Sequence, residues 1–255
     1  MRSEIKNAIR KLKPYKAPGI DSIHNIVLQE CKEVLVNNLY FIYCTILELN
    51  TYPTRWLIIL TIVLQKAGKA AYNVAKAYQP IGLLRMLGKL FSTLIVADLS
   101  YLTEKHQLLP PTQFGGCPNR CMTNTMHLIT HKIKEAWRRK EVASILFLDI
   151  QAAFPNMVKE CLLHNMKTRW IPTIYINQIE HMLSNCQTQI RFNDLLSNPI
   201  NINNGTMQGC PLSMLLYAFY NTNLIDIAKG KNELSTGFVD DCAFVMTGNS
   251  LETTH

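Results

Sequence analysis

Asp240 and Asp241 stand next to each other between two short apolar runs, residues 235–239 and 242–246. The two runs predict the strands of a β-hairpin, with the aspartates as its two-residue turn. Such turns favour Asn-Gly or Asp-Gly because their central residues often need positive φ, so Asp-Asp is a costly choice. Two adjacent carboxylates also repel each other unless a cation accompanies them. The feature therefore predicts either a solvated acidic turn or a divalent-cation site.

Composition and charge limit what the chain can be. Of its 255 residues 48% are hydrophobic and 17% are charged, which is typical of a globular protein with one large domain or two small ones. The formal net charge of +8 favours a polyanionic partner without identifying it. The longest uncharged apolar run, residues 57–64, is too short to span a bilayer, and no N-terminal signal is visible. We therefore expect a soluble, intracellular protein.

The eight cysteines are scattered without CxxC pairs, so we expect reduced packing residues and no disulfide-linked partner. Cys117, Cys121, His127 and His131 superficially resemble a zinc site. A classical zinc finger places about a dozen residues between its two ligand pairs, and this sequence has five. The spacing argues against zinc.

The hydrophobic periodicity predicts an α+β chain. Helices are expected at residues 3–13, 83–102, 123–139, 158–168, 174–183 and 212–228, and a buried helix or helical pair is expected at residues 25–49. Strands are expected at residues 57–65, 142–150, 188–192 and 199–202, besides the hairpin. Residues 142–150 form a continuous apolar run, which predicts a central strand.

Asp149 ends that apolar run and supplies a third carboxylate. If its strand packs beside the hairpin, negative charge gathers in a partly dry site, which is unfavourable without a cation. Mg²⁺ prefers oxygen ligands and usually leaves room for substrate phosphates. The spacing alone supports such a site weakly, because an aspartate at the end of a strand is often only a helix cap.

Seven motifs occur in an order that resembles the reverse transcriptase domain of non-LTR (LINE-type) retrotransposons. They are residues 15–21 (YKAPGID), 77–89 (AYQPIGLL through LGK), 113–116 (QFGG), 146–150 (LFLDI), 152–154 (AAF), 208–213 (QGCPLS) and 238–241 (FVDD). Residues 153–156 (AFPN) look most like fungal members. The resemblance covers essentially the whole chain and implies a right-hand polymerase. Its fingers would span residues 1–140. Residues 141–255 would form a C-terminally incomplete palm, with a ferredoxin-like split β-α-β sheet backed by helices and no thumb.

The resemblance also implies a two-metal site. Asp149 and Asp240 would bridge two Mg²⁺ ions, or Mn²⁺, with the carbonyl of Ile150 as a backbone ligand. Asp241 would be the supporting member of the pair. The implied reaction is attack of a primer 3′-OH on the α-phosphate of a dNTP, directed by an RNA template. The implied partners are this RNA template with its DNA primer and the dNTP, with no membrane, in an intracellular and nuclear setting.

The nucleotide-binding residues are implied in the same way. Phe154, beside Ala153, matches the aromatic steric gate that excludes a 2′-OH. Gln208 and Gly209 would line the nucleotide pocket. The remaining positions lie in the fingers, where they would approach the triphosphate: Lys66, Lys69 and Gln79.

Some residues depart from the family pattern. Gln79 stands where relatives usually have an arginine, and a neutral amide cannot replace a bidentate cation at a phosphate. Other departures are Gln65, Cys117, Cys121, Met207 and Cys210. Arginine-to-glutamine and arginine-to-cysteine changes arise from single transitions in CG-containing codons, so a decaying genomic copy is one interpretation.

Three alternatives stay open. A viral-type RNA-dependent RNA polymerase shares the palm, but typically has Gly before Asp-Asp and a small polar group at the position of Phe154. A group II intron-type reverse transcriptase shares the chemistry. The third alternative is a catalytically silent, nucleic-acid-binding remnant of a decayed retroelement.

Overall fold

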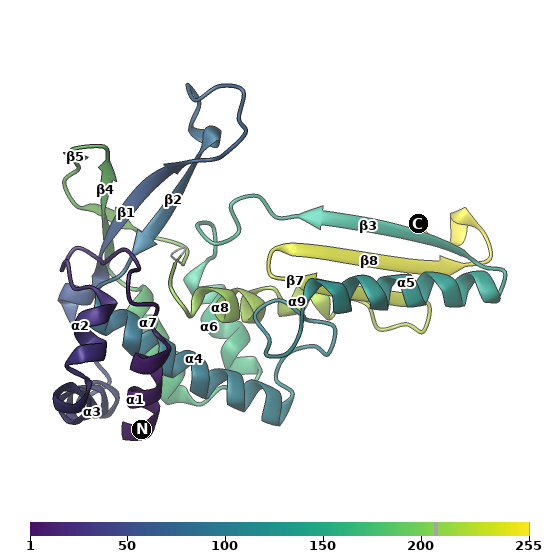
Figure 1. The fold of residues 1–255 in the computed structure, drawn as a ribbon. Helices are drawn as coiled ribbons and strands as arrows, with labels where there is room; N and C mark the ends of the chain where they lie inside the picture. Colours follow the sequence, from purple (N-terminus) through teal and green to yellow (C-terminus); the bar gives the residue numbers. More distant parts are fainter. Residues whose placement is uncertain (207–208, 255) are drawn as a thin grey trace. The chain divides into compact units, whose positions relative to one another are not determined.

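The chain folds into two compact units, each assembled from several stretches of sequence (Figure 1). The computed structural model describes residues 1–206 and 209–254. Unit 1 contains Met1–Asp98, Phe154–Lys159 and Pro172–Ser213, and unit 2 contains Leu99–Ala153, Glu160–Ile171 and Met214–His255. The division into fingers and palm near residue 140 stays a prediction.

Unit 1 is built on a five-stranded sheet in the order β2-β1-β4-β5, with β6 also paired to β4. Its strands are β1 (Ile58–Gln65), β2 (Tyr78–Leu83), β4 (Cys186–Phe192), β5 (Leu195–Leu196) and β6 (Ile200–Ile202). The isoleucine, valine and threonine residues of β1 are β-branched and favour this extended conformation. β1 runs antiparallel to β2 and parallel to β4, so it occupies an inner position in the sheet.

Helices enclose the core of unit 1. They are α1 (Arg2–Lys11), α2 (Asn25–Glu30), α3 (Lys32–Glu48) and α7 (Thr173–Leu183), with short 3₁₀ turns η1 (Thr54–Leu57) and η2 (Ala75–Ala77). The aromatic rings of Tyr43, Tyr52, Trp56 and Phe91 form one cluster, in which the centroids of Tyr43 and Phe91 lie 5.1 Å apart. The predicted helices at residues 3–13 and 174–183 are present, and residues 25–49 form a helical pair that divides at Cys31.

The long helix α4 (Met86–His106) is long and apolar enough to cross a membrane by length and composition. Leu90, Phe91 and Ile95 on this helix are buried, and Phe91 contacts the aromatic cluster of unit 1. These contacts are those of a core helix in a globular fold.

Unit 2 has a three-stranded antiparallel sheet in the order β3-β8-β7. Its strands are β3 (Val142–Asp149), β7 (Glu233–Phe238) and β8 (Asp241–Gly248). Its helical elements are α5 (Met122–Arg138), α6 (Lys159–Thr168), α8 (Ser213–Tyr220), α9 (Thr222–Ile225) and η3 (Leu251–Thr254), of which α6 and α8 begin at the boundary with unit 1. The helix α5 lies along one face of this sheet, where Ile129 packs against Ala243 and Val245 (Figure 1).

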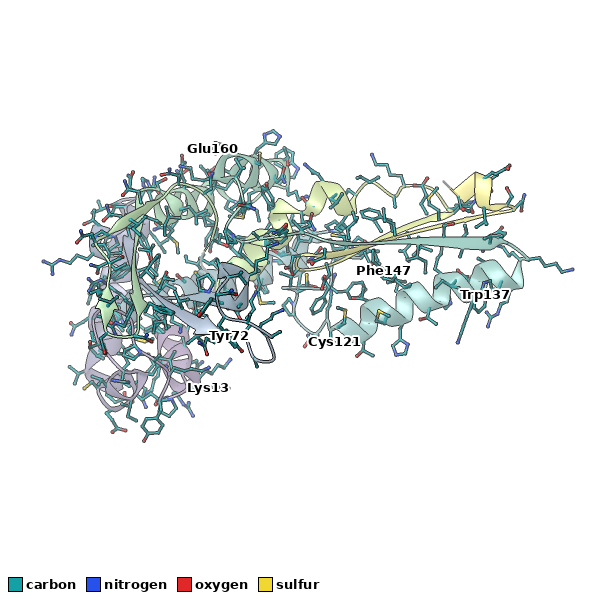
Figure 2. All side chains as sticks on the ribbon, turned by 90° about the horizontal axis from the view of Figure 1, so that it is seen from above. Lys13, Tyr72, Cys121, Trp137, Phe147 and Glu160 are labelled. Atoms are coloured by element: carbon teal, nitrogen blue, oxygen red, sulfur yellow. The ribbon has the colours of Figure 1, made fainter. Side chains whose placement is uncertain are left out.

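A strand and a helix of unit 2 differ from their predictions. Residues 142–150 were expected to form a central strand, but within the described sheet β3 is an edge strand with a partner on one side. Phe147 is 62% exposed, and Figure 2 shows its ring on β3. The single helix expected at residues 212–228 is divided into α8 and α9 at Asn221, whose side chain bonds to β8.

Candidate metal and nucleotide site

The hairpin of β7 and β8 carries the adjacent aspartates, but its tip lies one residue earlier than predicted. Phe238 pairs with Asp241, so Val239 and Asp240 form the turn and Asp241 begins β8. Val239 has a φ of +61°, a conformation that is strained for a β-branched residue. This strained position was not predicted from the sequence, because Val239 was placed at the end of the first strand of the hairpin.

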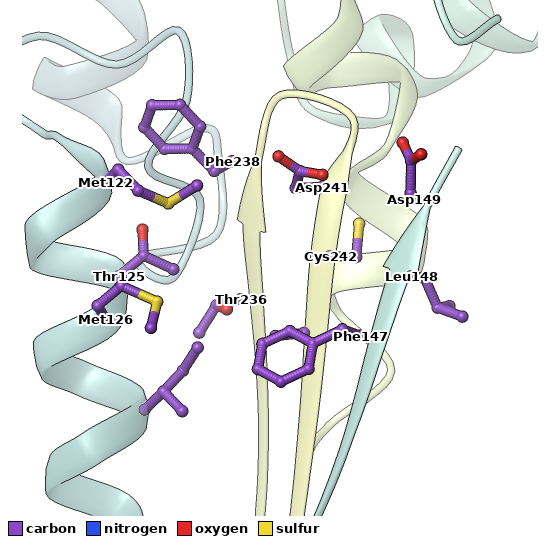
Figure 3. Close-up of a pocket in the computed structure, with 12 residues that line it drawn as sticks. Met122, Thr125, Met126, Phe147, Leu148, Asp149, Thr236, Phe238, Asp241 and Cys242 are labelled. Atoms are coloured by element: carbon purple, nitrogen blue, oxygen red, sulfur yellow. The ribbon is translucent and has the colours of Figure 1, made fainter. Parts of the chain in front are cut away.

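Asp149 lies directly opposite Asp241, at the last paired position of β3 and the first of β8. Directly opposed residues of antiparallel strands point to the same face of the sheet. Figure 3 shows the two carboxylates at the ends of the neighbouring strands. The prediction that the two distant stretches supply adjacent strands is therefore confirmed.

The electrostatics of this end of the hairpin favour a cation. Partial burial raises the pKa of the Asp241 carboxyl, and the negative charges of Asp240 and Asp149 raise it further. Within the described part of the chain, no group of three or more His, Cys, Asp or Glu side chains is arranged to hold a metal ion. Mg²⁺ is typically held by one or two carboxylates together with substrate phosphates and water, and a pair of aspartates matches that requirement.

A cavity of about 230 Å³ lies beside the two carboxylates, between α5 and the sheet (Figure 3). Its lining is mainly apolar: Met122, Met126, Ile129, Phe147, Leu148, Phe238, Cys242 and Ala243, together with Thr125, Thr236, Asp149 and Asp241. The hydroxyls of Thr125 and Thr236 are buried without a hydrogen-bond partner in the described structure. The two aspartates thus stand at the rim of a largely apolar recess.

Cys242 follows Asp241 and anchors β8 to the helices of unit 2. It is buried, and its Sγ accepts a hydrogen bond of 3.1 Å from Nδ2 of Asn221. Burial raises the pKa of this thiol. Asn221 is a residue that sequence reasoning missed, because it lies within an apolar run that predicts an unbroken helix.

The zinc alternative gains no support. Cys117 is buried, Cys121 is exposed, and all eight cysteines are free. The Oδ1 atom of Asn124 accepts hydrogen bonds from both the amide and the thiol of Cys121. Cys121 therefore serves as the N-terminal cap of α5.

The predicted triphosphate-binding residues of the fingers lie on the β1–β2 hairpin in unit 1. Lys66 and Lys69 are exposed in its loop, where the Lys66 amide donates to the carbonyl of Ala77 at 2.9 Å. Gln79 lies in β2 opposite Leu64 and is exposed. The structure thus places these three residues on one hairpin.

Gly205 and Thr206 lie against the backbone of Phe154 and Pro155, also in unit 1. The Thr206 amide donates to the Phe154 carbonyl at 2.9 Å. Gly205 has a φ of +89°, and a Cβ atom there would lie 2.5 Å from the carbonyl oxygen of Pro155. Residues 205 and 206, which come just before the motif at residues 208–213, are therefore held against the motif at residues 152–154 through a glycine.

The other predicted members of the nucleotide site are divided between the units. Gly209 has a φ of +109°, and a Cβ there would lie 2.5 Å from the carbonyl oxygen of Gly82 in β2. Ala153 is buried and belongs to unit 2, as do Ile150 and the aspartates, whereas Phe154 belongs to unit 1. Gln208 lies outside the described residues.

Asp21 belongs to the first of the seven motifs, and the sequence alone did not explain its role. Its Oδ2 accepts a hydrogen bond of 2.9 Å from the amide of Met86, the first residue of α4. A carboxylate at this end of a helix satisfies a free amide and favours the helix dipole. In the same motif, a Cβ on Gly19 would lie 2.4 Å from the Leu84 carbonyl oxygen.

Comparison with known proteins agrees with this geometry. Residues 64–254 match the family described as "Reverse transcriptase (RNA-dependent DNA polymerase)". The chain belongs to this family. Its similarity to polymerases of Drosophila transposons supports the resemblance to reverse transcriptases of non-LTR elements.

Three of the curated relatives come from mobile elements of Drosophila melanogaster. The chain is 28% identical over 251 residues to the probable RNA-directed DNA polymerase from transposon BS, covering 96% of this chain and 28% of the relative. It is 29% identical over 241 residues to the probable RNA-directed DNA polymerase from transposon X-element, covering 93% of this chain and 26% of the relative. It is 27% identical over 253 residues to the RNA-directed DNA polymerase from mobile element jockey, covering 97% of this chain and 27% of the relative. The chain thus spans about a quarter of the length of these relatives.

A solved structure supports the fold. The apo telomerase from Candida tropicalis, truncated from its C-terminal domain, superimposes with a TM-score of 0.57 at 10% identity. The match covers 80% of this chain and 46% of the telomerase chain. The α+β fold with reverse transcriptase fingers and palm, expected from the sequence motifs, is therefore confirmed.

Proposed function

We propose that this chain carries the polymerase centre of an RNA-directed DNA polymerase from a non-LTR retroelement. The observation that carries the proposal is the placement of Asp149 opposite Asp241, beside the turn residue Asp240. The family match and the named relatives support the same activity. The narrower assignment to fungal members and a nuclear location remain predictions of the sequence motifs.

The residues fit a pair of divalent cations. Asp149 and Asp240 would hold the ions, with the carbonyl of Ile150, and Asp241 would support them. Bound Mg²⁺ would activate the primer hydroxyl and stabilise the charge that develops on the phosphates. Burial and the charges of Asp240 and Asp149 raise the pKa of Asp241, and a bound cation would offset these charges.

The remaining residues would bind and orient the nucleotide. Phe154 would lie beneath the sugar and exclude a 2′-OH by its volume, with Ala153 beside it. Gln208 and Gly209 would line the pocket, while Lys66, Lys69 and Gln79 would approach the triphosphate. Positioning and charge stabilisation supply most of the rate enhancement in phosphoryl transfer, so the placement of these groups is their contribution.

Primer extension on poly(rA)/oligo(dT) with Mg²⁺ tests the proposal. We expect incorporation of dTTP by the parent chain and none by Asp240→Ala. The matched control is Asp194→Ala, since Asp194 is exposed between β4 and β5 in unit 1. Incorporation that survives Asp240→Ala would remove this aspartate from the chemistry.

A silent nucleic-acid-binding remnant is the second candidate. Gln79 favours it, because an uncharged amide at this position binds phosphate less strongly than an arginine. Binding of the RNA–DNA duplex without incorporation by the parent chain would support the remnant. Replacing Mg²⁺ by Mn²⁺ in the same assay tests which ion the centre uses.

A further inference from the structure

Residues 112–116 run along the end of β7, next to the turn that carries Asp240. Gln113 forms a parallel β-bridge with Gly237. The amides of Phe114 and Gly115 donate to the Gly237 carbonyl at 2.8 and 3.4 Å, and the Gly237 amide donates to Thr112 at 3.1 Å. The segment therefore pairs with the outer edge of β7, near the turn that carries Asp240.

Two glycines allow the segment to approach the turn closely. A Cβ on Gly115 would lie 2.2 Å from the amide nitrogen of Val239 and 2.8 Å from the carbonyl carbon of Phe238. A Cβ on Gly237 would lie 2.4 Å from Oε1 of Gln113. Because the first of these contacts is with backbone, rotation of a side chain cannot relieve it.

The buried side chain of Gln113 fixes the shape of the segment. It has no exposed surface, and its Nε2 donates to the Gly115 carbonyl at 3.0 Å. Arg120 supports the same segment from outside, donating from Nη1 to the carbonyls of Gln113 at 2.6 Å and Pro111 at 3.2 Å. Its other terminal nitrogen pairs with Glu104 at 3.4 Å.

Val239 needs such support. It is buried and β-branched, yet it holds a φ of +61°, a conformation that persists only where the surroundings enforce it. The backbone of residues 112–116 lies against its amide, within the distance that glycine alone permits. A relaxed Val239 would rotate the following peptide and move Asp240.

We propose that Gln113 and Gly115 are positioning residues that hold the Val239–Asp240 turn in its strained conformation, so that Asp240 is aligned with Asp149 for metal binding. Arg120 maintains the segment from the surface. This inference rests on the proposed function, because it assumes that the aspartates bind a divalent cation.

Mn²⁺ binding to the whole 255-residue chain, measured by electron paramagnetic resonance, tests the proposal without requiring polymerase activity. Asp240→Ala defines the carboxylate-dependent part of the binding. We expect Gly115→Ala to weaken that part about 10-fold or more, the range found when groups that orient metal ligands are removed. Gln113→Met, which keeps the length of the side chain and removes its donor, should weaken it several-fold.

Gly230→Ala is the matched control in the same unit. A Cβ there would meet only the end of the Glu233 side chain at 3.0 Å, and Mn²⁺ affinity should match the parent. Circular dichroism establishes which variants are folded at the temperature of the measurement. If Gly115→Ala and Gln113→Met do not fold, Arg120→Gln takes their place, because the partly exposed Arg120 side chain can be lost without leaving a buried cavity. We expect Arg120→Gln to weaken the carboxylate-dependent Mn²⁺ binding, and parental binding by this variant would contradict the proposal.

The outcomes separate this inference from the proposed function. If the parent binds Mn²⁺ no better than Asp240→Ala, the metal site itself is wrong. If the parent binds and folded Gly115→Ala binds equally well, residues 112–116 do not position the turn. Reduced binding by Gly115→Ala with parental binding by Gly230→Ala establishes the positioning role.

Discussion

Asp149 and Asp241 face each other across antiparallel strands, each at the end of its strand nearest the hairpin turn. This pairing brings residues 92 positions apart in the chain onto one face of one sheet. Asp240 adds a third carboxylate in the turn beside them. Without a cation, the like charges repel one another, and we expect this repulsion to lower the stability of the fold.

Asp241→Asn should stabilise the metal-free protein at neutral pH. Burial and then the charges of Asp240 and Asp149 raise the pKa of Asp241 above its ordinary value of 3.8. A carboxyl whose pKa is higher in the folded chain destabilises the fold as the pH rises from the unfolded value through the folded one. Thermal melts in EDTA should therefore give a higher Tm for the variant at pH 7 and no difference below about pH 3.5.

Added Mg²⁺ should reverse the order of the Tm values of the parent and Asp241→Asn. A ligand that binds only the folded state raises its stability, so the parent Tm should rise with Mg²⁺ more than that of Asp241→Asn. A lower Tm for the variant in EDTA at pH 7 would show that the ionised Asp241 has a favourable partner.

Gly205→Ala should destabilise unit 1. The new Cβ would lie 2.5 Å from the Pro155 carbonyl oxygen, at a φ of +89°. Strain of this kind costs about 1–3 kcal/mol. Gly68→Ala is the control, because Gly68 has a similar φ of +75° but open space around it. Urea unfolding that gives equal losses for the two variants would mean that the contact with Pro155 relaxes freely.

Phe154→Ala should admit ribonucleotides. The aromatic ring is the group proposed to exclude the 2′-OH, and the amide of Thr206 holds the backbone of Phe154 in place. The expected result is a rise in the kcat/KM for rNTP relative to dNTP of about 10-fold or more, as for loss of a steric contact of 1–3 kcal/mol. Phe41→Ala is the control, because Phe41 is an exposed phenylalanine on α3. Unchanged discrimination in an active variant would assign the gate to another residue.

Gln79→Arg should lower the KM for dNTP. A guanidinium can pair with phosphate oxygens through two hydrogen bonds, which an amide cannot do with the same strength. Steady-state kinetics with Val74→Arg as the comparison separate a specific contact from a general increase in positive charge, since Val74 is exposed in the connection between β1 and β2. An equal gain from both substitutions would indicate charge alone.

The elements with strong patterns could be predicted from the sequence. The apolar run of β1 and the helical spacing of α5 specify their structures locally, and both occur within a few residues of the expected bounds. From the sequence, the packing of β3 beside the hairpin was only a condition for a metal site, and the register of Asp149 opposite Asp241 meets that condition.

The details that failed depend on contacts between distant residues. The hairpin tip moved to Val239 and Asp240, where the backbone near Gly115 encloses the turn. The break between α8 and α9 coincides with the bond from Asn221 to Cys242, which lies 21 residues further along the chain. Neither contact leaves a mark in local periodicity, so neither could be predicted from one sequence.

The outer edge of β3 has a practical consequence for handling this protein. In the described sheet its backbone is paired on one side only, and Leu146 and Phe147 beside it are 55% and 62% exposed. An uncovered apolar edge of this kind is a template for strands of other molecules and promotes aggregation. Preparations should therefore be kept dilute, and a lysine at position 146 is a rational first change for improving solubility.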